Sequence, residues 1–178
     1  MMIEKIIDTY LQHMLDAGLN VLPTKIPSEM LRPESPTSEE WNEWLPIKST
    51  VTDSQIHVLE TTFNFKFPES YKRLLKHKHF CQLGIHEFNF YEFPSDNWFD
   101  HFTEKYTLNA HMLEEGHIPF AELGDYGNSS TLCFNSNEAT AQNEYSIWHW
   151  NFEEKKKVYE NFETMLISLD NTNETFVL

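Results

Sequence analysis

The chain has 178 residues and a mass of 21.2 kDa, which suits one domain with a short additional arm. Its composition is 40% hydrophobic and 15% aromatic, and this excludes a disordered chain. Thirteen Lys and Arg residues stand against 28 Asp and Glu residues, for a formal net charge of −15. Such a charge argues against binding to a nucleic-acid backbone or to an anionic membrane, and it favours a basic partner.

The first part of the chain is predicted to be helical and then extended. Apolar residues at spacings of three and four over residues 3–15 predict an amphipathic helix, which Gly18 ends. This helix needs a surface to pack on, either in its own domain or on a partner. Residues 20–46 hold five of the eight prolines and predict an extended connection that ends in a helical turn over residues 37–44, capped by Ser38.

Two further helices are expected before residue 80. One begins after Thr52 or Asp53, because an acidic residue suits the positive end of a helix. The other begins at Pro68, a favourable residue for a first turn, and ends in the basic turn of residues 76–79.

The second half of the chain alternates between strand and helix patterns. Residues 85–93 alternate apolar and polar side chains and predict one strand, and residues 96–115 return to helical spacing until Gly116. The remaining predicted elements are three strands and a final helix, at residues 118–123, 130–134, 145–150 and 161–169. Helices first, and then strands framed by helices, predict an α+β fold. We expect an arm over residues 1–40 and the main domain over residues 41–178.

The acidic charge is concentrated in this second half. Residues 1–80 carry 11 acids and 9 bases, a net of −2, whereas residues 81–178 carry 17 acids and 4 bases, a net of −13. Between residues 86 and 125 there are nine acids, and Lys105 is the only Lys or Arg. The stretch is either a solvated face that aids solubility or a surface shaped for a cationic partner.

The sequence offers little catalytic chemistry. It contains no glycine-rich phosphate loop, no G-x-S-x-G turn and no H-E-x-x-H pair, and its nine histidines lack metal-ligand spacing. Cys81 follows His77 and His79, so a Cys/His nucleophile is conceivable, but a buried thiol is the favoured reading. Two cysteines form no disulfide framework, and the chain shows no signal peptide and no spanning segment. We therefore expect a soluble cytoplasmic protein with no catalytic residues, no cofactor and no metal.

A binding surface is the remaining candidate site. Most aromatic residues have core spacings, but Trp98 and Tyr126 sit beside acids and are the expected interface anchors. The candidate partner-binding residues are Glu87, Glu92, Asp96, Trp98, Asp100, Glu104, Glu114, Glu115, Glu122, Asp125 and Tyr126.

Five segments, in order, resemble the SUKH superfamily of Smi/Knr-type proteins. Pro68-Glu69-Ser70-Tyr71 leading to Leu74-Leu75 is similar to the start of that family's second helix, and Ile147-Trp148-His149-Trp150 is similar to one of its strands. The five segments are residues 44–60, 65–75, 118–135, 147–151 and 161–166. Departures are Asn151, where the family commonly has an acid, and residues 77–80, where it often has glycines.

The resemblance implies an α+β fold with a central, mostly antiparallel sheet and no catalytic machinery. For bacterial members it implies an immunity protein that neutralises a cognate toxin, frequently a nuclease, and for eukaryotic relatives a regulatory or scaffold role. Our leading hypothesis is neutralisation of a basic toxin through an acidic surface. The alternatives are an interaction module that docks through its first helix, and an uncharacterised enzyme or metal protein.

Overall fold

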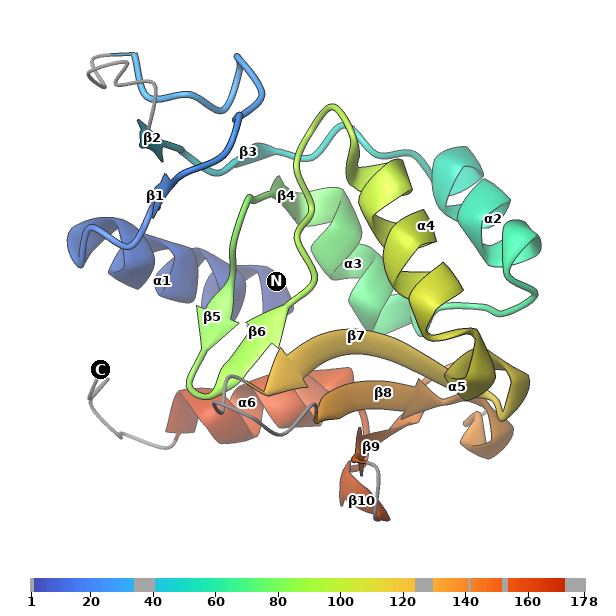
Figure 1. Ribbon diagram of the computed structural model, residues 1–178. Coiled ribbons are helices and arrows are strands. Elements are labelled where there is room, and N and C mark those ends of the chain that lie inside the picture. The colour runs from blue at the N-terminus through green and yellow to red at the C-terminus, as the bar shows by residue number, and fades with distance from the viewer. Residues whose placement is uncertain (1, 34–40, 124–129, 141, 152–153, 172–178) are drawn as a thin grey trace.

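The main sheet of the protein is antiparallel throughout. The computed structural model describes residues 2–33, 41–123, 130–140, 142–151 and 154–171. Six strands pair in the order β10-β9-β8-β7-β6-β5 (Figure 1). Their bounds are β5 Gly84–Ile85, β6 Phe88–Phe90, β7 His117–Leu123, β8 Thr131–Asn135, β9 Ser146–Trp150 and β10 Lys155–Tyr159. The expected α+β class with an antiparallel sheet is confirmed.

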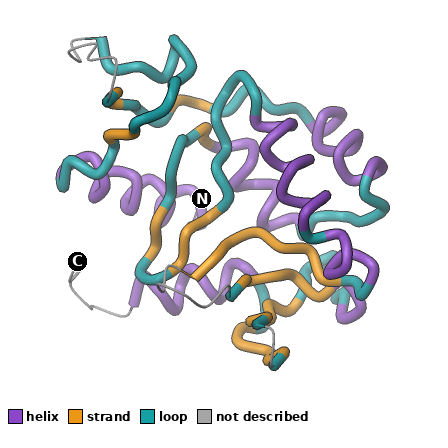
Figure 2. The backbone as a smooth tube through the Cα atoms, in the orientation of Figure 1, coloured by secondary structure: helices purple, strands orange, loops and turns teal. Residues whose placement is uncertain are grey.

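Helices and two small strand pairs complete the described part of the chain. The helices are α1 Met2–Asp16, α2 Asp53–Thr62, α3 Glu69–His77, α4 Trp98–Leu108, α5 Ala110–Glu114 and α6 Phe162–Asn171, with a 3-10 turn, η1, at Ser136–Glu138. The pairs join β1 Val21–Leu22 to β2 Asn42–Glu43, and β3 Ile47–Lys48 to β4 Lys78–His79. Figure 2 shows the connection between α1 and α2 mostly as loop, as its prolines predict.

The core lies between the sheet and helices α3 and α6. Tyr71 of α3 packs against Phe120 of β7 and Phe134 of β8, with ring centroids 5.7 and 5.2 Å apart. Phe162 of α6 closes this cluster at 5.3 Å from Tyr71. All four rings are at most 1% exposed, so these aromatics serve the core, as their spacing predicts.

Helix α1 packs against its own chain. It contacts α3, α6 and β5, and Ile3 and Ile7 are fully buried. Glu4 of α1 accepts two hydrogen bonds from the Arg73 guanidinium of α3, at 3.1 and 2.8 Å. The apolar face of α1 is therefore covered within the protein, and it is not a free docking element.

The starts of α2 and α3 lie where the sequence predicts them. Thr52 caps α2 through its hydroxyl, which accepts from the Gln55 N–H at 3.3 Å, while the Gln55 side chain accepts from the Thr52 N–H at 2.9 Å. Pro68 provides no capping side chain for α3. Instead, the Ser70 N–H donates to the Glu144 carboxylate at 2.8 Å, so a residue 74 positions away caps this helix.

Two of the predicted elements are interrupted. The strand expected over residues 85–93 is wrong, because His86 takes a positive φ of 52° and the chain reverses there to form the β5–β6 hairpin. The helix expected over residues 96–115 breaks at Asn109, which ends α4 and precedes α5. The Asn109 side chain donates to the Lys105 carbonyl at 2.9 Å and so competes with the helical hydrogen bonds.

Other differences lie at chain ends and edges. The helical turn expected over residues 37–44 is wrong for residues 41–44, which are extended, while Ser38 lies outside the described residues. The helix expected to continue through residues 76–79 ends at His77, because Lys78 and His79 form β4. Strand β10 was not predicted, since its three consecutive lysines give no apolar alternation.

Candidate functional site

Helix α4 presents an aromatic face to the core and an acidic face to solvent. Trp98, Phe102 and Tyr106 follow one another at intervals of four residues and are all buried. Because an α-helix turns about 100° per residue, Asp100 and Glu104 lie on the opposite side, where both are exposed. The same periodicity that builds the core therefore places two carboxylates on the surface.

Two further carboxylates flank α4 from the sheet. Glu92 follows β6 and lies 3.5 Å from the imidazole of His101, and Glu122 of β7 lies 2.7 Å from the Lys105 ammonium. Asp96 stands just before α4 and is exposed. We call the group of Glu92, Asp96, Asp100, Glu104 and Glu122 the acidic α4 surface.

The acids of this surface differ in whether they are already neutralised. Glu92 and Glu122 have the partners His101 and Lys105. The side-chain carboxylates of Asp96, Asp100 and Glu104 make no hydrogen bond or ion pair with any described residue. Their negative charge is therefore available to a cationic group from outside.

The other predicted site residues lie elsewhere or outside the described chain. Glu114 and Glu115 belong to α5, and Glu115 pairs with Lys155 of β10, whose hydrogen bond lowers the pKa of that carboxyl. Glu87 is exposed in the β5–β6 turn. Asp125 and Tyr126 lie outside the described residues. The acidic stretch of residues 86–125 is thus not a single surface.

The predicted anchor Trp98 is buried, whereas Leu108 on the same helix is exposed. Trp98 is only 6% exposed and packs against Phe93 at 5.4 Å, so its expected role as an exposed interface anchor is a misassignment. Leu108 was not singled out, yet it is 70% exposed and continues the spacing of Asp100 and Glu104 along α4. In the sequence, Leu108 follows Glu104 by the same four residues that separate Asp100 from Glu104, and this spacing places all three on one face of the helix.

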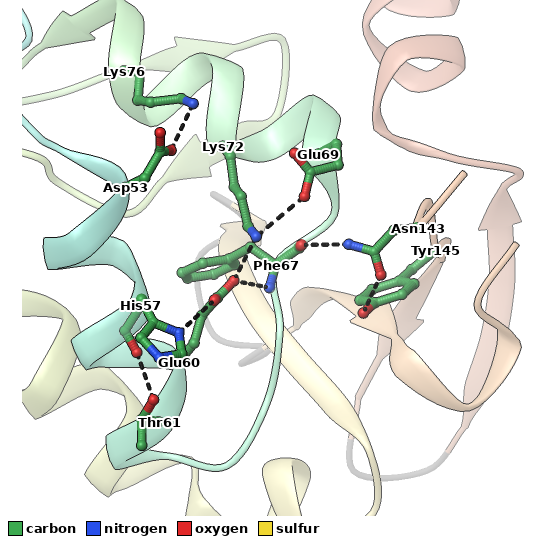
Figure 3. Close-up of polar contacts among 10 residues, drawn as sticks. All are labelled: Asp53, His57, Glu60, Thr61, Phe67, Glu69, Lys72, Lys76, Asn143 and Tyr145. Carbon is green, nitrogen blue, oxygen red and sulfur yellow. Dashed lines mark hydrogen bonds and ion pairs between the residues drawn. The ribbon is translucent and has the colours of Figure 1, made fainter. Parts of the chain in front are cut away.

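A second polar cluster joins α2, α3 and the loop before β9 (Figure 3). Glu60 is 6% exposed, and its carboxylate accepts from the Phe67 N–H at 2.8 Å and lies 3.0 Å from the Lys72 ammonium. Burial acts to lower the pKa of Lys72, but hydrogen bonds to Glu60 and Glu69 outweigh it and raise that pKa overall. The buried carboxylate is therefore compensated and ties the α2–α3 loop to α3.

The loop before β9 closes the same cluster. Asn143 donates from its amide to the Phe67 carbonyl at 3.3 Å and accepts from the Tyr145 hydroxyl at 3.2 Å (Figure 3). Its φ of 56° is a conformation that asparagine tolerates better than most residues. Every polar group here has a structural partner, so we assign this cluster to the scaffold.

The thiols are not in an environment that activates them. Burial, together with the charges of Glu92 and Asp96, raises the pKa of Cys81 to about 12, and burial raises the pKa of Cys133 to about 12. A thiolate is the reactive form, so neither cysteine is poised as a nucleophile near neutral pH. Among the described residues, no group of three or more His, Cys, Asp and Glu side chains is arranged to hold a metal ion. No helix in the described ranges is long and apolar enough to cross a membrane.

These features define an α+β protein with a helix-covered antiparallel sheet and one partly uncompensated acidic surface. The model of the SMI1 / KNR4 family (SUKH-1) matches residues 50–168, from the turn before α2 to the last turns of α6. That match covers more than half of the chain, and the protein belongs to this family. A comparison with curated proteins finds no match for this sequence.

Proposed function

We propose that this protein is a non-catalytic immunity protein that binds and neutralises a basic toxin in the cytoplasm. The observation that carries the proposal is the set of unpaired carboxylates at the start of α4 and along it, namely Asp96, Asp100 and Glu104, within a chain of net charge −15. Membership of the SMI1 / KNR4 family supports a protein-binding role. A nuclease toxin must approach phosphate groups with a basic face, and such a face is complementary to this surface.

The proposed mechanism requires no covalent chemistry from this protein. The unpaired carboxylates accelerate encounter with a cationic face and set its orientation, because long-range attraction acts before contact. Leu108, 70% exposed beside Glu104 on α4, provides an apolar contact once the surfaces meet. The bound protein then excludes the anionic substrate of the toxin by its bulk and by its charge.

The test is a capture experiment from the source cells with the tagged protein, washed at low salt, with the retained proteins identified by mass spectrometry. The account predicts one basic toxin-like partner, which is lost from the double variant Asp100→Lys, Glu104→Lys. The matched control is Glu114→Lys, which reverses an exposed charge on the neighbouring helix α5. Retention of a regulatory or cell-wall protein in place of a toxin would contradict the proposal.

A further inference from the structure

A hollow of about 230 Å³ lies beside α4, where β6 and β7 face the helix. Its lining includes Tyr91, Glu92, His101, Lys105 and Glu122, together with Asn89 and Phe90. A carboxylate that follows β6 and another on β7 therefore meet two aromatic residues, Phe90 and Tyr91, in a single concave site. The acidic α4 surface thus includes a recess as well as exposed charges.

Tyr91 supplies the aromatic ring of the lining that a cation already contacts. Its side chain is 4% exposed, and its hydroxyl has no hydrogen-bond partner in the described part of the chain. Burial, followed by the charge of Glu122, raises the pKa of Tyr91 well above its usual value, so the ring stays neutral at physiological pH. A neutral phenol ring next to carboxylates is a favourable surface for a cation.

The protein's own cation already uses these contacts. The Lys105 ammonium lies 5.0 Å from the centroid of the Tyr91 ring and 2.7 Å from the Glu122 carboxylate. Lys105 is 37% exposed, and its flexible chain can turn toward solvent without disturbing the core. Lys105 therefore marks a cation site that an incoming group can share or take over.

We propose that this hollow accepts an arginine side chain of the basic partner, an inference that rests on the proposed function. A guanidinium group is planar and stacks on an aromatic ring, and its forked donors can reach two carboxylates at once. Tyr91 provides the ring, and Glu92 and Glu122, which line the same hollow, provide the carboxylate acceptors. A lysine ammonium on the partner would only duplicate the contacts that Lys105 makes already.

The test uses a probe that requires no toxin. The isotope-labelled protein is titrated with the blocked tripeptide acetyl-Gly-Arg-Gly-amide and followed by amide NMR shifts. The neutral control is the same peptide with citrulline in place of arginine. We expect saturable shifts at Tyr91, Glu92 and Glu122 with a Kd on the order of millimolar, and none with citrulline.

Two variants decide whether the hollow itself binds the peptide. Lys105→Met removes the internal competitor and is expected to lower the Kd by about threefold or more, whereas Glu122→Gln raises it by a similar factor. The matched control Lys156→Met removes an exposed charge on β10 and leaves the Kd unchanged. Equal shifts with the citrulline peptide, or an equal effect of both lysine variants, would overturn the assignment.

Failure of this inference is distinguishable from failure of the proposed function. A captured toxin that is lost from the Asp100→Lys, Glu104→Lys variant but binds Glu122→Gln with full affinity would contradict the arginine site alone. Arginine-specific shifts in the hollow, combined with capture of a regulatory protein in place of a basic toxin, would support the site and contradict the proposed function.

Discussion

At the residue scale, the buried imidazole of His79 joins two distant segments. It is fully buried, and Nδ1 lies 3.2 Å from the Phe93 carbonyl, while Nε2 accepts from the Thr50 N–H at 3.2 Å. A carbonyl only accepts, so the hydrogen-bond pattern assigns the proton to Nδ1. Burial lowers the pKa of His79, because an imidazolium loses its hydration there, and this effect outweighs the Phe93 carbonyl and the charge of Glu29, which act to raise it.

This geometry predicts a pH-dependent contribution to stability. In the unfolded chain, His79 has a pKa of about 6.5, and in the folded protein its pKa is lower. Between these two pKa values the unfolded chain therefore binds more protons than the folded protein. The His79 contribution is therefore fully present above about pH 6.5 and is lost as the pH falls toward the lower folded pKa. We expect His79→Gln to cost about 1–3 kcal/mol at neutral pH, and less near pH 5.5.

Urea unfolding of both proteins at several pH values measures this effect. Comparing wild type with His79→Gln cancels the general effect of titrating the acidic surface, and also that of His117, whose pKa is likewise lowered by burial. A difference in unfolding free energy that stays constant or widens as the pH falls would contradict the lowered pKa of His79.

The buried carboxylate of Glu60 gives a second prediction at this scale. Glu60 and Glu69 both pair with the Lys72 ammonium, but their side chains are 7% and 58% exposed. Removing the buried partner leaves the Phe67 N–H without its acceptor and Lys72 with only the exposed Glu69, so Glu60→Ala should cost about 2–3 kcal/mol. Glu69→Ala should cost about 0.5 kcal/mol or less, because exposed pairs are weak. Similar unfolding free energies for the two variants in urea would show that Glu60 is not the tie between α2 and α3.

At the element scale, α1 is part of the core and not an arm. Ile7 is fully buried against the domain, whereas Gln12 on the opposite face is exposed. Ile7→Ala is expected to lower the unfolding free energy by about 2–4 kcal/mol, because it leaves a cavity, and Gln12→Ala by less than about 0.5 kcal/mol. Thermal or urea unfolding measures both. A negligible cost for Ile7→Ala would mean that α1 is only loosely attached.

Sequence patterns predict a helix or strand well when all the residues that determine it lie within that element. The apolar spacing of α1, the Thr52 cap and the Pro68 start each lie within one helix, and each is found near its predicted place. The β5–β6 reversal depends on the positive φ of His86, and histidine is not one of the residues that dominate turns. Strand β10 forms because β9 offers a partner edge, and no pattern in Lys155-Lys156-Lys157 reveals that edge.

The candidate site could be predicted only in part for a related reason. The concentration of acids after residue 85 was evident, but their grouping depends on the fold. Asp100 and Glu104 share one face of α4, whereas Glu115 lies across the sheet beside Lys155. The acids next to Trp98 favour an interface position, whereas its spacing from Phe102 and Tyr106 favours a core position. The structure follows the spacing, and Trp98 is buried with Phe102 and Tyr106. The hollow at Tyr91 joins residues of β1, β6, β7 and α4 and has no local sequence signature.

At the scale of the whole molecule, charge is arranged unevenly over a stable scaffold. Several acids are neutralised locally, as by the Glu4–Arg73 and Glu115–Lys155 pairs, while the α4 carboxylates are left unpaired. Unpaired exposed charges repel one another, and this repulsion offsets the modest gain that Asp100 makes in the first turn of α4, so neutralising both acids should not reduce stability appreciably. We expect the Asp100→Asn, Glu104→Gln variant to match or slightly exceed the wild-type Tm while it binds the partner more slowly. A lower Tm by calorimetry would show that these acids serve the fold.

The central claim is that the acidic α4 surface steers a basic partner onto this protein. The most direct measurement is the association rate constant with the captured partner, determined from about 50 to 300 mM salt. The account predicts that the wild-type rate falls by about tenfold or more across this range. It also predicts that Asp100→Lys, Glu104→Lys is already slow at low salt and depends little on salt. A salt-independent wild-type rate, or an equal loss of rate in Glu114→Lys, would contradict the account.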